Sequence, residues 1–177
     1  MNAKLQSTFD ALESQRSRLL NELRSLPLDV LTSTPAAKWS ILMILSHIIA
    51  AERMGLNYVH KKILGVKEVG TSGLWEESKL LTFLVSQRIP MLKYKAPRVI
   101  VENTVSYTDL RTIEKEWEKL RAEWRLFLEA LPEQYTNRKI FRHAVGGRFD
   151  VRQGLIVFRE HINHHLPQIR GRMKTVR

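Results

Sequence analysis

Apolar residues recur with the period of an α-helix in four long segments of the chain, at about residues 4–26, 41–64, 109–131 and 151–170. The first segment repeats Leu5, Phe9, Leu12, Leu19, Leu23 and Leu26, and the third repeats Ile113, Trp117, Leu120, Trp124, Phe127 and Leu128. Polar residues fill the positions between them, so each segment carries one apolar stripe. The pattern predicts four amphipathic helices.

Residues that start and end helices flank these segments. Ser40 is the expected N-cap of the second helix and Thr108 that of the third, while Asp150 and Gln153 form a capping-box pattern before the fourth. The expected ends are marked by Pro27, Gly65, Pro132 and Gly171. Start and stop signals thus agree with the apolar periodicity.

The connections are long after the second and third helices. In the first of them, residues 74–89 predict a shorter helix that ends near Pro90, and residues 97–106 predict an extended segment. Residues 137–149 predict a loop that turns at Gly146-Gly147. We therefore expect an all-α fold, a single domain over residues 1–177, as an antiparallel four-helix bundle with a small extra helix between helices 2 and 3. Connections of this length also permit crossovers, and the sequence does not decide this point.

Composition adds the expected environment. The chain has 177 residues, 44% of them hydrophobic and 27% charged, as in soluble globular domains. It has no cysteine, which excludes disulfides and thiolate metal sites and suits a reducing cytoplasm. The first residues lack the apolar stretch of a signal peptide, and the longest apolar run, residues 41–51, is too short to cross a membrane. We expect a cytoplasmic protein.

The net charge of +11 attracts anions. It is consistent with an enzyme that has a basic surface and an anionic small-molecule substrate, and also with a nucleic-acid-binding protein. The first is favoured because the positive residues form no long run. The densest group, Arg170, Arg172, Lys174 and Arg177, follows a helix, whose C-terminal dipole favours cations.

Three histidines lie on apolar stripes of two helices. His47 is within about 60° of Met43, Ile44, Ala51, Met54 and Tyr58 on the helical wheel. His161 and His165 are one turn apart on the stripe of the last helix, the spacing at which one helix can supply two ligands to one metal ion. A single histidine on such a stripe is usually a core residue bonded to the backbone, but an imidazole there is costly unless paired or ligated.

The three imidazoles are expected to converge if the two helices are antiparallel neighbours, since His47 is early in one and the pair is late in the other. Their ligand nitrogens should then lie about 3–3.5 Å apart, and a His47 ring more than about 8 Å from both others would exclude a shared ion. The remaining histidines are expected elsewhere: His60 exposed, His164 at the edge of the stripe, and His143 packed in the loop before the last helix.

Three imidazole ligands suit zinc, nickel, copper or iron, and leave a coordination position open as in catalytic sites. No acidic residue lies within one turn on the face of His161 and His165, so the sequence names no general base. It also contains no cysteine nucleophile, no Gly-x-Ser-x-Gly motif and no phosphate-binding glycine loop.

The chain resembles the DinB/YfiT-like superfamily of metal-binding four-helix bundles. The resemblance rests on Trp39-Ser40, His47 and Ala51-Glu52-Arg53 at the second helix, on His143, Gly146 and Phe149 before the last helix, and on His161, His165 and Gln168-Ile169 within it. One departure is Met43, where the family often has an acidic residue. That position affects helix capping and leaves the metal site intact.

The resemblance implies that His47, His161 and His165 are ligands of a divalent metal, zinc or nickel before others. It also implies a metal-dependent enzyme that activates water, as a hydrolase, or a low-molecular-weight thiol, as an S-transferase, and we expect it to form a homodimer. The alternatives are a basic helical protein that binds nucleic acid or another polyanion with structural histidines, and a metal-binding bundle that acts as a sensor or carrier.

Overall fold

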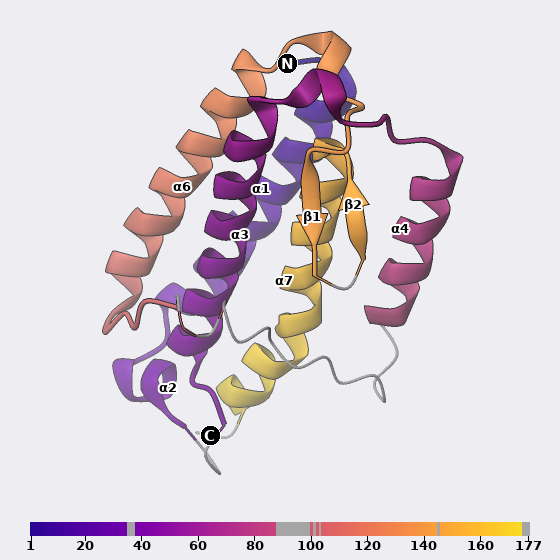
Figure 1. Cartoon of the computed structure of the whole chain (residues 1–177). Helices are drawn as coiled ribbons and strands as arrows, with labels where there is room; N and C mark the ends of the chain where they lie inside the picture. Colours follow the sequence, from indigo (N-terminus) through magenta and orange to yellow (C-terminus); the bar gives the residue numbers. More distant parts are fainter. Residues whose placement is uncertain (35–37, 88–99, 101, 103, 145, 175–177) are drawn as a thin grey trace.

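The computed structural model describes residues 1–34, 38–87, 100, 102, 104–144 and 146–174. Its helices and strands are α1 Ala3–Arg24, α2 Leu28–Thr32, α3 Ile41–Ile63, the 3₁₀ turn η2 Val66–Glu68, α4 Leu74–Gln87, α6 Leu110–Ala130, the 3₁₀ turn η3 Glu133–Tyr135, β1 Phe141–His143, β2 Gly147–Phe149 and α7 Val151–Lys174. The long helices α1, α3, α6 and α7 form the bundle, with α4 at its side (Figure 1). The all-α fold expected from the sequence is confirmed.

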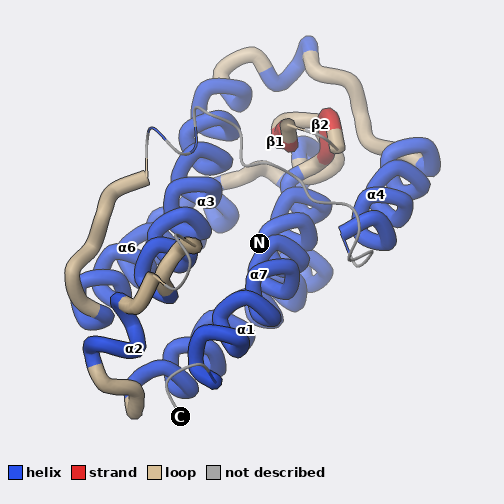
Figure 2. Tube along the Cα trace, turned by 90° about the horizontal axis from the view of Figure 1, so that it is seen from below, coloured by secondary structure: helices blue, strands red, loops and turns tan. Residues whose placement is uncertain are grey.

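Helix α3 packs against both α6 and α7, and α1 packs against α7 and α6 on the other side of the bundle (Figure 2). Helices α3 and α7 are antiparallel. Helices α1 and α7 run in the same direction, since Gln15 bonds to Asn163 and Glu22 pairs with Arg170 further along both helices. Helices α3 and α6 are also parallel, as the contacts Glu52–Arg121 and His60–Phe127 show.

The expectation of an antiparallel bundle is therefore wrong for these two pairs. The physical reason is the long connection between α3 and α6, which includes α4 and returns the chain to the end of the bundle at which α3 begins (Figure 1). A short connection would have forced an antiparallel neighbour.

Two of the predicted helix starts are confirmed. The Ser40 hydroxyl accepts a hydrogen bond from the Met43 N–H at 3.2 Å. Asp150 and Gln153 form the complete capping box, with the Gln153 N–H bonded to Asp150 Oδ1 at 2.8 Å and the Asp150 N–H bonded to Gln153 Oε1 at 3.1 Å.

Two helix ends differ from the prediction. The N-cap of α6 is Asp109 rather than Thr108, because the Asp109 carboxylate accepts bonds from both the N–H and the hydroxyl of Thr112 at 2.8 Å. Helix α7 continues through Gly171 to Lys174, since Gly171 does not take the left-handed conformation that ends a helix.

The connecting segments are partly as expected. The helix predicted over 74–89 is α4, and residues 88 and 89 lie outside the described part. The predicted extended stretch 97–106 is described only at residues 100, 102 and 104–106, of which Ile100 and Glu102 are helical and not extended. The loop predicted over 137–149 contains the antiparallel hairpin β1–β2, which turns near Gly147 at a φ of +86°.

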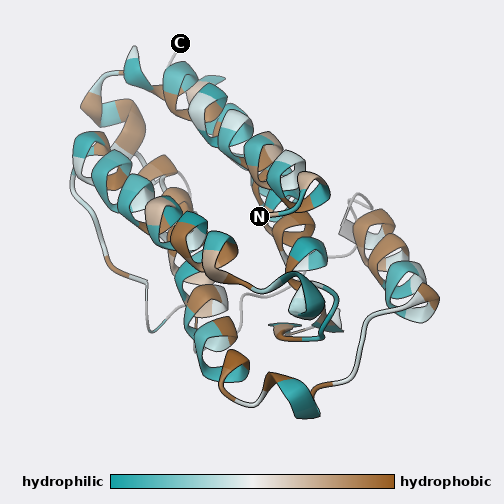
Figure 3. Cartoon of the chain, turned by 90° about the horizontal axis from the view of Figure 1, so that it is seen from above, coloured by the Kyte–Doolittle hydropathy of each residue, from teal (hydrophilic) through white to brown (hydrophobic). Residues whose placement is uncertain are grey.

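One cluster of buried apolar side chains fills the space between the bundle helices. In Figure 3 the hydrophilic positions of these helices lie mainly on their outer sides. The hairpin is anchored in this core by Phe141, whose ring packs edge-on against Phe158 at 5.2 Å between centroids. Two helical glycines leave room for these rings. A Cβ at Gly154 would lie 2.6 Å from Phe141 Cγ, and one at Gly55 would lie 2.5 Å from Phe158 Cζ. Among the described residues, no helix combines the length and apolar character that a bilayer span requires.

A charged cluster is buried between α3 and α6. The Glu52 carboxylate accepts hydrogen bonds from Arg121 at 2.7 Å and from the Trp117 indole at 2.9 Å, and Arg121 also lies 3.2 Å from Glu13 Oε1 on α1. Glu52 and Arg121 are 1% and 2% exposed, so each charge depends on the other for compensation.

Substituting Gly154 with alanine is expected to destabilise the protein by about 1–3 kcal/mol, because the new methyl group overlaps the Phe141 ring. Gly171→Ala is the matched control, since a Cβ at this position meets nothing within 4 Å. The substitution also replaces a helical glycine with a residue that favours the helix. The control should gain about 0.5–1 kcal/mol. Urea unfolding of both variants gives the comparison, and equal effects would contradict the close packing.

Replacing Arg121 with methionine is expected to cost about 3–5 kcal/mol, because the Glu52 carboxylate would remain buried without its counter-charge. The double variant Glu52→Met/Arg121→Met should recover most of that loss. Urea unfolding of the single and double variants measures this. A double variant less stable than the single one would contradict the argument.

Candidate metal centre

His47 lies in the first half of α3, and His161 and His165 lie in the second half of α7. Because these helices are antiparallel neighbours, the three rings meet. The centroid of the His47 ring is 5.1 Å from that of His161 and 5.2 Å from that of His165, and the latter two are 4.8 Å apart. The two contacts of His47 are edge-on, at interplanar angles of 79° and 80°.

The ring nitrogens are close enough to share one ion. One nitrogen from each histidine lies within 4.8 Å of the other two, and among the described residues this is the group of side chains with metal-ligand geometry. Nε2 of His161 and Nε2 of His165 are 3.1 Å apart, within the spacing of about 3–3.5 Å that was predicted for all three nitrogens, while the distances to His47 are bounded only by 4.8 Å. The 8 Å separation that would have excluded a shared ion is not found.

The contacts of the rings fit a metal. Gln168, one turn after His165, has Oε1 3.2 Å from His165 Nδ1, and an Nδ1–H donated there leaves the lone pair on Nε2, which faces His161. Nδ1 of His47 is buried and has no hydrogen-bond partner among the described residues. A buried polar atom of this kind normally has a partner, and an ion ligated at that nitrogen would supply one.

Burial holds the imidazoles neutral, the form that binds metal. It lowers the pKa of His47 to about 4, with a further contribution from His164. Burial, and then the neighbouring His47, lower the pKa of His165 to about 3, while the contact with Gln168 acts in the opposite direction. Burial also lowers the pKa of His161 well below its usual value, and the neighbouring His165 and His47 lower it further.

The other histidines do not join the group. His60 is exposed and contacts Phe127 on α6, as its wheel position predicted. His164 is half-buried, and its ring contacts that of His165 at 5.2 Å. His143, predicted to pack in the loop, lies on β1, where it packs on Phe83 and its Nδ1 accepts the Gly146 N–H at 3.0 Å; burial lowers its pKa to about 4.

A cavity opens beside His47. Its described lining comes from the start of α3 and from the segment before α6, and the residues are Trp39, Met43, Ser46, His47, Thr104, Ser106 and Tyr107. Met43 is 42% exposed here, although the wheel placed it on the apolar stripe, because this end of the stripe faces the cavity and not the core. A larger hollow between the C-terminal halves of α3 and α6 touches none of the three histidines.

A comparison with protein-family models matches the DinB superfamily over residues 11–169. The chain belongs to the DinB superfamily. A search of curated proteins and a search of solved structures found no match. The match begins within α1 and ends within α7, includes all three histidines of this DinB protein, and so confirms the family resemblance read from its motifs.

Sequence reasoning missed several features of the site. Gln168 was named as part of the motif of the last helix, but its contact with His165 was not predicted, although a residue three positions after His165 lies on the same side of the helix. The cavity lining from Thr104 to Tyr107 could not, because it approaches His47 only through the fold. Glu52 belongs to the same second-helix motif as His47. Its position on the helical wheel did not predict that Trp117 and Arg121 of α6 would bury it.

The metal-free protein is expected to lose stability as the pH falls from about 6.5 toward 4. Over this window the unfolded chain protonates its histidines, whose ordinary pKa is about 6.5, while His47 and His165 stay neutral in the fold. The slope is at most about 1.4 kcal/mol per pH unit for each histidine. Urea unfolding in the presence of a chelator measures it.

The matched variants are His165→Gln, which should flatten this slope, and the exposed His60→Gln, which should leave it unchanged. A wild-type protein whose stability is constant between pH 6.5 and 5 would contradict neutral burial of the group.

Proposed function

We propose that this DinB protein is a divalent-metal-dependent enzyme in which His47, His161 and His165 hold the ion. The observation that carries the proposal is the convergence of three neutral imidazoles from two helices, one of them with a buried nitrogen that has no partner among the described residues. Placing three imidazoles together in a bundle is costly unless a ligand satisfies them.

The donor set supports zinc or nickel. All three donors are imidazole nitrogens, and within the described part of the chain no carboxylate belongs to the group. Three protein ligands leave a coordination position for water or substrate. The cavity beside His47 gives small molecules access to that side of the group.

An ion bound there supplies the positive charge that lowers the pKa of a water molecule or of a small thiol. The chain's own residues prepare the site. Gln168 orients the His165 ring, and the Trp39 ring covers His47 at 5.1 Å between centroids, which limits the access of bulk water. The proposed reaction is therefore hydrolysis or transfer to a low-molecular-weight thiol.

The alternative, a polyanion-binding protein, is supported by the outer face of the hairpin. Arg142 and Arg148 are directly opposite each other in the β1–β2 register and are both exposed, an arrangement of like charges that destabilises a hairpin. With the net charge of +11, this pair favours contact with an anionic surface. Such binding predicts structural histidines and no metal.

Elemental analysis of protein purified without a metal-affinity tag is expected to find about one zinc or nickel ion per chain. His161→Ala and His165→Ala should abolish binding, because each removes one of three ligands. His60→Ala and His164→Ala are the controls and should keep the metal. A metal-free wild-type protein, or equal loss from His164→Ala and His165→Ala, would contradict the assignment.

A metal-loaded protein could still be a sensor or carrier. Turnover of an electrophile with a low-molecular-weight thiol, or hydrolysis without one, separates the enzyme from these. The expected result is turnover by the wild-type protein and none by His165→Ala at equal folded concentration.

A further inference from the structure

The cavity beside His47 is small. Its volume is about 150 Å³, and its described lining runs from Trp39 and Met43 to Tyr107. A cavity of about this size in a protein core holds a single benzene ring. Sites for larger organic ligands are usually about 300–1,000 Å³. The space next to the histidine group therefore matches one six-membered ring or a chain of similar volume.

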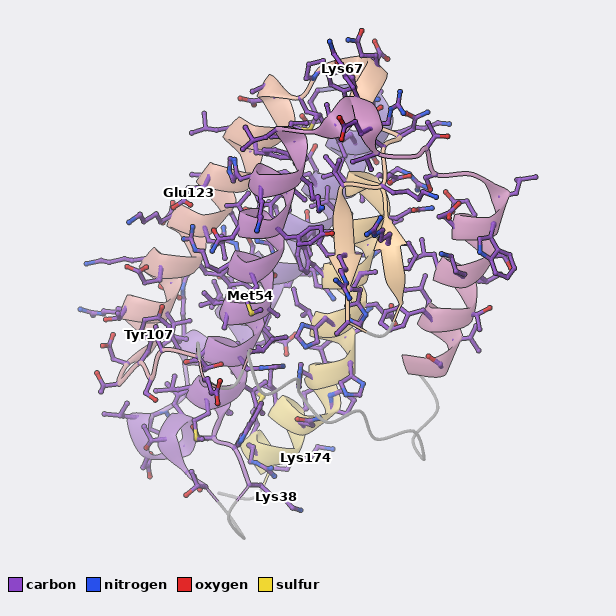
Figure 4. The ribbon with its side chains drawn as sticks, in the orientation of Figure 1. Lys38, Met54, Lys67, Tyr107, Glu123 and Lys174 are labelled. Atoms are coloured by element: carbon purple, nitrogen blue, oxygen red, sulfur yellow. The ribbon has the colours of Figure 1, made fainter. Side chains whose placement is uncertain are left out.

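The described walls of the cavity carry no charge, and most of their surface is apolar. Trp39 and Tyr107 supply aromatic surface and Met43 a thioether, and Figure 4 shows Tyr107 on the α6 side of the first half of α3. No acidic or cationic side chain is among the described residues that line the cavity. A charged group placed inside would lose its hydration without gaining a counter-charge from these side chains.

Besides His47, the polar side chains of the described lining carry hydroxyls, and three of these have distinct roles. The protons of Ser46 and Thr104 are already donated to the carbonyls of Leu42 and Ile100, at 2.7 and 2.8 Å. These two oxygens can therefore only accept. Tyr107 is protonated at neutral pH, as tyrosines ordinarily are, and burial and then the nearby Glu116 raise its pKa further. Its hydroxyl can donate to a carbonyl or hydroxyl oxygen of a ligand.

Positive charge lies outside the cavity, next to Trp39. Lys38 precedes Trp39 in the sequence, and the Arg172 Nε–H donates to the Trp39 carbonyl at 3.1 Å. Lys38 and Lys174 lie together at the end of the bundle where α3 begins and α7 ends (Figure 4). An acidic group elsewhere on the same substrate would therefore find its counter-charge near these cations and not among the described residues that line the cavity.

We propose that the cavity is the substrate pocket of the site and that it takes a compact, uncharged ring, such as an aromatic ring bearing a hydroxyl or carbonyl group. The proposal rests on the metal-dependent function proposed above, since it places this ring beside His47. Size selects one ring, and the lining selects an uncharged one.

Benzyl alcohol and benzoate are a matched pair of probes, equal in size and different in charge. Benzyl alcohol is expected to bind with a Kd of about 1 mM, the range for so few atoms, and to shift the indole N–H resonance of Trp39 in ¹H–¹⁵N spectra. That resonance is identified by its loss in Trp39→Phe. Benzoate should bind at least about tenfold more weakly.

Met43→Trp fills the pocket and should weaken benzyl alcohol binding at least about tenfold, the loss expected when a ring-sized cavity is filled. Ser46→Val is a second, smaller change in the same pocket. Leu126→Trp is the control, because Leu126 lines the larger hollow between α3 and α6. Benzoate binding as tight as benzyl alcohol, no benzyl alcohol binding at about ten times the expected Kd, or loss of binding in Leu126→Trp alone would each overturn the proposal.

The same titration on His161→Ala separates this inference from the proposed function. Ring binding by that variant, whose ligand set is incomplete, supports the pocket whether or not an ion is present. Absence of ring binding by a wild-type protein that does contain metal would overturn the pocket and leave the metal site standing.

Discussion

The buried pair of Glu52 and Arg121 fixes helix α3 against α6, and the rest of the site depends on this contact. Glu52 lies five residues after His47, on the side of α3 that faces α6. With Glu52 bonded to both Arg121 and Trp117, the rotation of α3 about its axis is determined. His47 then faces α7, where Gly55 allows the Phe158 ring to approach and brings the two helices together. A buried ion pair is a weak source of stability, but it strongly disfavours packings that separate its charges.

The parallel pairing of α3 and α6 has a consequence for the cavity. Two parallel neighbours need a connection that travels the length of the bundle, and here the last part of that connection, from Thr104 to Tyr107, passes beside the start of α3. The crossover thus supplies one wall of the space next to His47, and α3 supplies the other. An up-down bundle with a short turn between these helices would expose that side of His47 to solvent. The path of the connection between α3 and α6 therefore determines how a small molecule can reach His47.

The helices could be predicted because they depend on local periodicity, and the three-histidine group could be predicted on the condition that α3 and α7 are antiparallel neighbours. Apolar spacing and the caps at Ser40 and Asp150 place the stripes, and the stripes place His47, His161 and His165. Features that depend on contacts between distant segments could not be predicted. The parallel pairs follow from the path of a long connection, and the burial of Glu52 follows from Arg121 on another helix. The start of α6 was misplaced by one residue because Thr108 and Asp109 are both good N-cap residues, and the end of α7 by a few residues because Gly171 stays helical.

The charge of the group bears on the kind of chemistry it supports. Three imidazoles held neutral by burial bring no negative charge, and no carboxylate joins them among the described residues. The two positive charges of a divalent ion would therefore remain uncompensated by its protein ligands, in a chain whose net charge is already +11. An anionic donor in the open position restores the balance, and this favours loss of a proton from water or from a thiol that binds there. A carboxylate in the ligand set would weaken that preference.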